Sequence, residues 1–306
     1  MNTFGNNFRL SIYGESHGPV IGIVLDGVRP GLELSEDSFT EDLGRRRPGA
    51  EGTTARVEPD PVKILSGVYR GRTTGAPLCI EIPNLDVCSA PYEGISQHPR
   101  PGHADLTAAL KFGGFNDPRG GGHFSGRLSA ALVAAAVVAK KMLPGYAFEA
   151  KVVEVGGLKE NWGPAIEAAR SEGDSLGGIV ECRVKGVPAG LGEPFWDSVE
   201  SLVAHAVFAI PGVRGIEFGD GFAAAAKKGS EHNDIIGPDG RVQSNHAGGV
   251  NGGITNGQDL LFRVAFKPAS SIAKAGIPGR HDACFVLRTP VIVEAAAAIV
   301  FAGLQK

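Results

Sequence analysis

The segment Ser129–Leu143 constrains the fold of this chain more than any other, because a helix formed by it would be apolar on nearly all sides. Alanine, the residue with the highest helix propensity, is its commonest residue. A surface helix carries a polar face, and this segment has none before Lys140. The run Val291–Phe301 is similar, and both are shorter than the roughly 20 residues that span a bilayer. We therefore expect two helices buried inside a folded protein.

Short strands and further helices alternate along the rest of the chain. The strand-like runs are partly alternating and bounded by Gly, Pro or Asp; they are Val20–Leu25, Val62–Val68, Pro77–Ile82, Ala150–Val155, Ile179–Val184 and Leu260–Phe266. Two more helices are expected at Ala165–Ser171 and Asp197–Ala209, the second ended by Pro211-Gly212. Because strands and helices are intermixed, the chain is predicted to be α/β or α+β rather than all-β.

One pattern of strand, glycine turns and helix occurs twice. The first copy contains Gly22–Val24, Gly27, Gly31, Asp37-Ser38 and Pro48-Gly49. The second contains Gly178–Val180, Gly186, Gly190, Asp197-Ser198 and Pro211-Gly212. Asp or Ser at a helix start accepts hydrogen bonds from the first free N–H groups. We expect a duplicated core with pseudo-two-fold symmetry, and chance similarity of glycine-rich turns is the alternative.

Composition excludes several classes of protein. No low-complexity linker divides the 306 residues, so residues 1–306 are expected to form one domain. The net charge of −3 argues against a nucleic-acid partner, since such domains carry a basic excess. The four cysteines form no CxxC pair, so neither a metal site nor a disulfide framework is expected. With no signal peptide at its start, the chain is predicted to be cytoplasmic and not bound to membranes.

The 45 glycines gather in loops, and polar side chains stand beside them. Gly14–Gly18 presents Ser16 and His17, and the turn Pro101-Gly102 presents His103. An imidazole titrates near pH 6.5 and can exchange a proton at cellular pH. Asp105 is expected to cap a helix that runs toward Lys111. In isolation, each histidine is equally consistent with a surface turn.

Other loops suit anions. Gly120–Gly122 leads through Ser125 and Arg127 to the helix that starts at Ser129, and a helix N-terminus attracts negative charge. Further cations and hydroxyls are Arg45-Arg46-Arg47, Lys267, Ser270, Ser271 and Arg280, the last followed by His281 and Asp282. The polar, Gly- and Asn-rich residues 224–260 form a candidate ligand loop. Although each could be a solvated turn, together they predict a phosphorylated carboxylate as substrate.

These motifs also resemble those of the chorismate synthase family. The resemblance covers the chain from Phe4 to about Ala302 and lies in motifs that follow in order: Gly14–Gly18, Arg45–Gly49, Glu58–Asp60, Val62–Val68, Arg100–Asp105, Gly215–Asp234, Asn245–Gly257 and Gly279–Asp282. It implies an α+β fold, a β-α-β sandwich with helices packed between two antiparallel sheets, assembled as a homotetramer. It also implies a carbon–oxygen lyase of the shikimate pathway that acts on a phosphate ester.

The implied reaction is the anti-1,4-elimination of phosphate and a ring proton from 5-enolpyruvylshikimate 3-phosphate, giving chorismate. It uses reduced FMN without net redox change. Since no reductase domain is seen, an external flavin reductant is expected, with NADPH as electron donor. By motif, the resemblance assigns catalysis to His17, His103 and Asp282, substrate binding to Ser16, Arg46, Arg127 and Arg280, and FMN binding to Ser125, Asn245, Lys267, Ser270 and Ser271. No metal is implied.

Two positions depart from the family pattern. Members commonly show Arg-Ser-Ser-Ala-Arg-Glu-Thr after the triple glycine, where this chain has His123 in place of the first Arg and Leu128 in place of the Glu. These two differences leave open the alternative that the protein is a non-catalytic homologue that binds flavin or another anion. A metal-dependent hydrolase using His17, His103, His281 and Asp282 is a second alternative, although no tight ligand motif such as HExxH is present.

Overall fold

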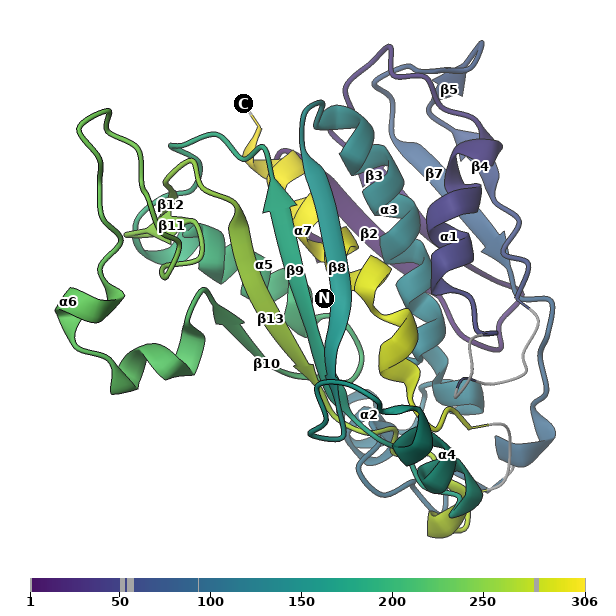
Figure 1. The fold of residues 1–306 in the computed structure, drawn as a ribbon. Helices are drawn as coiled ribbons and strands as arrows, with labels where there is room; N and C mark the ends of the chain where they lie inside the picture. The colour runs from purple at the N-terminus through teal and green to yellow at the C-terminus, as the bar shows by residue number, and fades with distance from the viewer. Residues whose placement is uncertain (1, 50–52, 54–57, 93, 278–280, 306) are drawn as a thin grey trace.

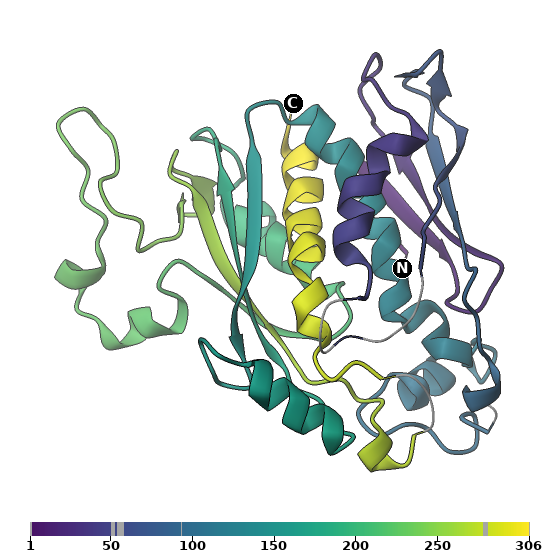
Figure 2. The same ribbon diagram turned by 45° about the vertical axis from the view of Figure 1, so that its right-hand side comes forward.

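Two antiparallel sheets enclose a layer of helices in this protein, as Figures 1 and 2 show. The computed structural model describes residues 2–49, 53, 58–92, 94–277 and 281–305. One sheet has the strand order β1-β2-β3-β7-β4, and the other has the order β10-β13-β9-β8. Helix α3 packs on β3 of the first sheet and α7 packs on β8 and β9 of the second, while α3 and α7 pack on each other. The predicted α+β sandwich is confirmed.

The element bounds are as follows. The strands are β1 (Thr3–Phe4), β2 (Arg9–Gly14), β3 (Val20–Asp26), β4 (Lys63–Ser66), β5 (Val68–Tyr69), β6 (Arg72–Thr73), β7 (Leu78–Pro83), β8 (Ala147–Val155), β9 (Gly178–Lys185), β10 (Val213–Phe218), β11 (Val250–Asn251), β12 (Ile254–Thr255) and β13 (Leu260–Phe266). The α-helices are α1 (Thr40–Arg46), α2 (Asp105–Phe112), α3 (Ser129–Met142), α4 (Gly163–Ser171), α5 (Val199–Phe208), α6 (Gly229–His232) and α7 (Pro290–Leu304). Among these helices none is long and apolar enough to pass through a bilayer.

Helices α3 and α7 form the centre of the core. Every residue of α3 from Ser129 to Ala139 is buried, as is every residue of α7 from Val291 to Ala302. The sheets supply the rest of the core from one face of each strand: in β13, for example, Leu260, Phe262, Val264 and Phe266 are buried and the residues between them are partly exposed. This alternation follows from the two-residue period of a strand. The prediction of two buried helices is confirmed.

The strand predictions were confirmed where a run was continuous and failed where glycine or charge interrupts it. Strands β3, β7, β8, β9 and β13 lie where they were expected. The run Val62–Val68 is instead divided between β4 and β5 around Gly67, whose φ of +86° ends the first strand. Strands β2 and β10 were missed, since each combines an arginine and a glycine with only a few apolar residues.

The two halves of the chain repeat one topology. The order β2-β3-β7-β4 in the first sheet corresponds to β8-β9-β13-β10 in the second, strand for strand in chain order. In each half a small two-stranded hairpin comes just before the last strand of the sheet in chain order: β5-β6 before β7, and β11-β12 before β13. A buried helix comes later in the chain, α3 in the first half and α7 in the second. This correspondence supports the predicted duplication.

One set of hydrogen bonds is also repeated. Thr73 Oγ1 accepts from Leu32 N at 3.0 Å and donates to Arg29 O at 2.7 Å. Thr255 Oγ1 accepts from Leu191 N at 2.9 Å and donates to Pro188 O at 2.7 Å. In both halves the threonine ties the small hairpin to the glycine turn that follows the second strand, so the repeated sequence pattern has a structural counterpart.

Candidate active site

The triple glycine brings two histidines to one loop. Gly120, Gly121 and Gly122 have φ values of +60°, +82° and +52°, a region that favours glycine. A Cβ atom on Gly120 would lie 2.3 Å from His17 Cδ2, and one on Gly121 would lie 3.3 Å from His103 Cε1. The loop therefore packs on both imidazoles, and only residues without a side chain allow this approach.

His17 lies at the end of β2, buried among polar and aromatic groups. Its Nδ1 is 2.9 Å from Ser89 Oγ, and its ring packs edge-on to Tyr92 with the ring centroids 5.1 Å apart. The backbone N–H of Ser16 donates to Gly122 O at 3.1 Å, which fixes the histidine turn against the glycine loop. The structure thus places Ser16 and His17 together, as the sequence predicted.

His103 lies in the turn before α2 and contacts a buried ion pair. Its Nδ1 is 2.6 Å from Asp105 Oδ1, and Asp105 accepts from Arg100 Nε at 2.8 Å and Nη2 at 2.9 Å. Burial and the nearby Arg100 hold the pKa of His103 below its usual value, and Asp105 opposes them only in part. The expectation that Asp105 caps α2 was wrong: Ala104 is at the N-cap, and the carboxylate of Asp105 binds Arg100 and His103 instead.

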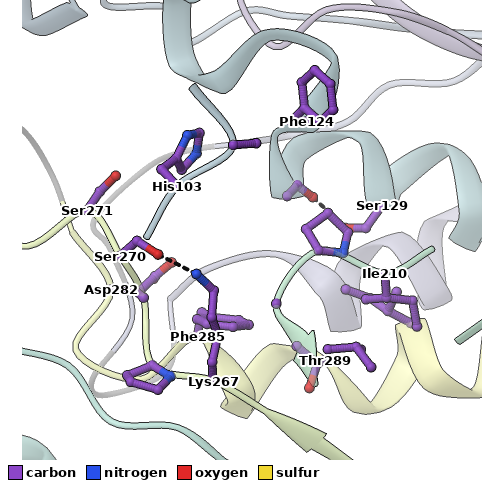
Figure 3. A pocket seen from close by; sticks show the side chains of 18 of the residues that line it. His103, Phe124, Ser129, Ile210, Lys267, Ser270, Ser271, Asp282, Phe285 and Thr289 are labelled. Atoms are coloured by element: carbon purple, nitrogen blue, oxygen red, sulfur yellow. Dashed lines mark hydrogen bonds between the residues drawn. The ribbon is translucent and has the colours of Figure 1, made fainter. Parts of the chain in front are cut away.

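A cavity of about 620 Å³ opens beside His103 and is shown in Figure 3. Its lining includes the apolar side chains of Phe124, Ile210 and Phe285 and the polar side chains of Lys267, Ser270 and Ser271. Lys267 Nζ donates to Gly102 O at 2.6 Å and also contacts Ser270 Oγ, and burial lowers the pKa of its ammonium. Three of the five residues predicted to bind FMN thus share a cavity with His103.

Asp282 also lines this cavity. Its Oδ2 accepts from Arg288 Nη2 at 2.5 Å, and Arg288 lies in the short helical turn before α7. Arg288 therefore holds the carboxylate of Asp282 in place at the cavity wall. Arg280, predicted to bind substrate, lies outside the described residues.

Arg46 and Arg127 meet at a pair of acidic side chains. Arg46, 2% exposed, donates to Asp60 Oδ2 at 3.1 Å and also contacts Glu58. Arg127 contacts Asp60 and lies 3.4 Å from Glu58 Oε2. Ser16, Arg127, Glu58 and Asp60 line a cavity of about 20 Å³, while Arg46 also lines the large cavity. Ser16, Arg46 and Arg127, all predicted to bind substrate, thus lie near one another. Glu58 and Asp60 partly balance the charge of the two arginines.

The three adjacent arginines Arg45-Arg46-Arg47, which the sequence placed among the candidate anion-binding cations, do not face one common site. Arg45 binds Glu294 and Asp42, Arg46 binds Glu58 and Asp60, and Arg47 donates to Pro59 O. Each side chain leaves α1 or its end in a different direction because residues adjacent in a helix face different ways. Of the three, only Arg46 reaches the cavity.

Two predicted FMN-binding residues lie elsewhere. Ser125 accepts from Arg127 N at 3.3 Å and lines a separate apolar cavity of about 260 Å³. Asn245 donates to Asp259 O at 2.8 Å, just before β13 starts, whereas Lys267 follows the end of β13. Seven strand residues separate the two places, roughly 20 Å. Among the described residues of 224–260, none lines the large cavity, and the role of this segment as a ligand loop stays a prediction.

Comparisons with known proteins decide the family. A sequence profile of the chorismate synthase family matches residues 8–305. The chain belongs to the chorismate synthase family. A chorismate synthase of Chitinophaga pinensis is 53% identical over 100% of this chain and 96% of its own length. One of Korarchaeum cryptofilum is 45% identical over 98% of this chain and 96% of its own length.

Structural comparison agrees. A solved structure described as "Crystal Structure of Chorismate Synthase" superposes with a TM-score of 0.77 at 30% identity, covering 98% of this chain and 92% of that one. As a chorismate synthase family member, the chain is an enzyme, a lyase of the shikimate pathway, and its family implies a flavin cofactor. None of the comparisons supports the non-catalytic alternative.

The two departures from the chorismate synthase pattern have structural roles. His123 Nδ1 is 2.8 Å from Gly14 O and its Nε2 is 3.2 Å from Asn2 Oδ1, so the ring joins the glycine loop to the turn that carries His17. Leu128 is buried and lines the apolar cavity near Ser125. His123 also lines the large cavity, but both of its ring nitrogens face groups of the protein.

Sequence reasoning gave no role to Arg100, Arg288, Glu58 or Asp60. Arg100 is the first residue of the Arg100–Asp105 motif, and this position was the available signal. No motif in the sequence singles out Arg288, because only the fold of the turn between Asp282 and Arg288 brings the two side chains together. Glu58 and Asp60 could have been suspected from the three adjacent arginines Arg45-Arg46-Arg47, since buried guanidinium groups need anionic partners.

Proposed function

We propose that this enzyme converts 5-enolpyruvylshikimate 3-phosphate into chorismate by anti-1,4-elimination, with reduced FMN and no net redox change. The ring C–O bond to phosphate breaks, phosphate leaves, and a ring proton is lost to a base. The observation that carries the proposal is the packing of His17 and His103 on adjacent glycines of one loop, beside a cavity lined by cations, hydroxyls and apolar side chains. This arrangement suits a polyanionic substrate beside a planar cofactor.

His17, in this proposal, protonates or stabilises the departing phosphate. Ser16, Arg46 and Arg127 hold the phosphate and carboxylates of the substrate, together with Arg280. Glu58 and Asp60 keep the two buried guanidinium groups in place before the substrate arrives, as charged groups this buried need partners. Asp282, held in place by its ion pair with Arg288, accepts the ring proton.

The cavity has the size and lining for a flavin. Its volume of about 620 Å³ lies within the range of about 300–1,000 Å³ typical of cofactor sites. Lys267, Ser270 and Ser271 would hold FMN, with Phe124, Ile210 and Phe285 against its ring system. Reduced FMN, when bound, supplies transient electron donation that helps phosphate leave. His103 would hold or transfer a proton at the cofactor's edge, and Ser125, which lies beside Gly121 as His103 does, would help to hold the cofactor.

We propose also a homotetramer in the cytoplasm that receives reduced flavin from an external NADPH-dependent source. Exposed Phe195, Trp196 and Phe222 support self-association, because large aromatic side chains seldom stay in water. Within an assembly, Asn245 could reach FMN only in a neighbouring copy, since it lies about one strand length from the cavity of its own chain. Light scattering of the purified protein measures the assembly.

The deciding experiment is an anaerobic assay with 5-enolpyruvylshikimate 3-phosphate and chemically reduced FMN, following chorismate and phosphate together. Equal formation of both, dependent on reduced flavin, is expected. Flavin binding without turnover would favour the non-catalytic homologue. Folded protein that binds neither ligand would overturn the proposal.

A further inference from the structure

Arg100 joins three parts of the candidate site. Its guanidinium donates to Asp105 from Nε and Nη2 and to Ser271 Oγ from Nη1 at 2.9 Å. It also lies over the ring of Tyr92, 5.5 Å from the centroid, and Tyr92 packs on His17. Arg100 is 5% exposed and Asp105 is 9% exposed, so these contacts are shielded from water. A buried guanidinium with its donors used in this way is rigid.

The contact between His103 and Asp105 fixes where the imidazole carries its proton. An ionised carboxylate can only accept a hydrogen bond, so the 2.6 Å distance from Nδ1 to Asp105 Oδ1 requires a proton on Nδ1. Arg100 Nη2, which donates one N–H to Asp105 Oδ1 at 2.9 Å, also lies 3.1 Å from this nitrogen, and its second N–H could bond to Nδ1 only if Nδ1 carried no proton. If Nδ1 lacked its proton, two lone pairs would face each other at 2.6 Å.

We propose that Asp105, held by Arg100, is a positioning residue that keeps His103 in the tautomer with the proton on Nδ1 and the lone pair on Nε2. The Nε2 edge lies along Gly121, away from the ion pair and beside the cavity that His103 lines. In its neutral form His103 therefore presents a proton acceptor to a bound ligand. The catalytic consequence rests on the proposed role of His103, whereas the tautomer itself does not.

Other charged groups near His103 do not replace Asp105. Lys267, from the segment after β13, disfavours a charged imidazole, as does Arg100. Asp282 lines the same cavity but is paired with Arg288. Of the acidic side chains described, Asp105 is the one whose carboxylate contacts the ring of His103.

Ring-nitrogen NMR of the full-length protein, without substrate or flavin, tests the tautomer. The spectrum is recorded well above the ordinary imidazole pKa of about 6.5, and His103→Gln identifies the signals. The wild type should show Nδ1–H alone, and Asp105→Asn should show a mixture with Nε2–H. Asp26→Asn, which breaks the exposed pair with Arg9, is the control and should leave His103 unchanged.

Two further measurements make the test decisive. Asp105→Asn should lower kcat by on the order of 10²-fold with a smaller change in KM, and move the acid limb of kcat/KM to lower pH because a carboxylate that favours the imidazolium is lost. If Asp105→Asn does not fold, Arg100→Lys, which keeps the charge but not the paired donors, should give the tautomer mixture. An unchanged His103 spectrum in a folded Asp105→Asn or Arg100→Lys protein would overturn the proposal. Because the spectrum needs no turnover, this result is distinct from failure of the proposed reaction.

Discussion

Gly120 lies so close to His17 that a Cβ atom on it would stand 2.4 Å from His17 Nε2. The same atom would be 3.0 Å from Ser16 Oγ, so this glycine sets the space for both side chains. Its φ of +60° adds a second requirement for glycine, since an L-residue there costs about 1–2 kcal/mol.

Gly120→Ala should therefore lower kcat by about 10²-fold, because His17 must move to make room for the methyl group. The protein should still fold, as Gly120 itself is only partly buried. Gly126→Ala is the matched control: nothing lies within 4 Å of its Cβ position. Steady-state kinetics with circular dichroism checks both variants, and wild-type turnover by Gly120→Ala would contradict the assigned position of His17.

His103 should make folding depend on pH. Burial lowers its pKa in the folded protein, whereas in the unfolded chain the pKa is near 6.5. Between these two values the unfolded chain binds more protons, so stability falls as the pH falls through this window. Urea unfolding at several pH values within this window should show that the free energy of unfolding falls more steeply with falling pH in the wild type than in His103→Gln. Equal slopes for the two proteins would show that the folded-state pKa is not lowered.

The sequence predicted the parts of the fold that depend on continuous apolar runs. Ser129–Leu143 and Leu260–Phe266 could be placed because burial leaves a nearly continuous apolar run in the sequence of each. The repeated glycine turns also predicted the duplicated topology, since turns need glycine at fixed places. Strands such as β10, whose neighbours rather than its own residues stabilise it, left no such signal.

The site was predictable only in part, because side-chain partners come from distant segments. His17 and His103 could be singled out from their glycine turns, yet Gly120 and Gly121 were needed to place both on one loop. The role of Asp105 was misjudged because local spacing suggested a cap, while Arg100 offered it a stronger charged partner. The separation of Asn245 from the cavity depends on the length of β13, which no motif reveals.

His123→Ala should weaken catalysis moderately. The substitution removes the hydrogen bond from the ring of His123 to Gly14 O, which links the glycine loop to the turn that carries His17. One such bond is worth about 1 kcal/mol, so a fall of about fivefold in kcat/KM is expected. His98→Ala, on the exposed segment before Arg100, serves as a control with no effect. Full activity of His123→Ala would mean that the ring only fills space.

Glu294 should contribute to stability and not to catalysis. It is 1% exposed in the middle of α7, and it accepts from Arg45 Nη2 at 2.6 Å, Lys140 Nζ at 3.3 Å and Ala150 N at 3.1 Å. Glu294→Gln should lower the free energy of unfolding by about 2–3 kcal/mol, less than for a fully buried pair because Arg45 reaches water. Glu167→Gln, in an exposed pair with Arg170, should cost less than about 1 kcal/mol. Urea unfolding and kcat, measured together, check this, and a large loss of kcat in folded Glu294→Gln would contradict it.

The two hairpin threonines provide a test of the repeat itself. Thr73 and Thr255 are both buried, and each hydroxyl accepts one backbone hydrogen bond and donates another. Replacing either by valine keeps the shape but leaves a partly buried N–H and C=O without this partner, at a cost of about 1 kcal/mol for each hydrogen bond lost. Thr73→Val and Thr255→Val should therefore destabilise the protein by similar amounts.

Their effects should also add in the double variant, since the two hairpins lie on opposite sides of the molecule (Figure 1) and share no partner. Additivity within about 0.5 kcal/mol is expected for separated sites. Thr107→Val, at an exposed position of α2, controls for the loss of a hydroxyl in water. If Thr73→Val costs as little as Thr107→Val while Thr255→Val is costly, the two halves share a topology but not the interactions that stabilise it. Similar, additive losses would show that both halves are stabilised by the same repeated hydrogen bonds.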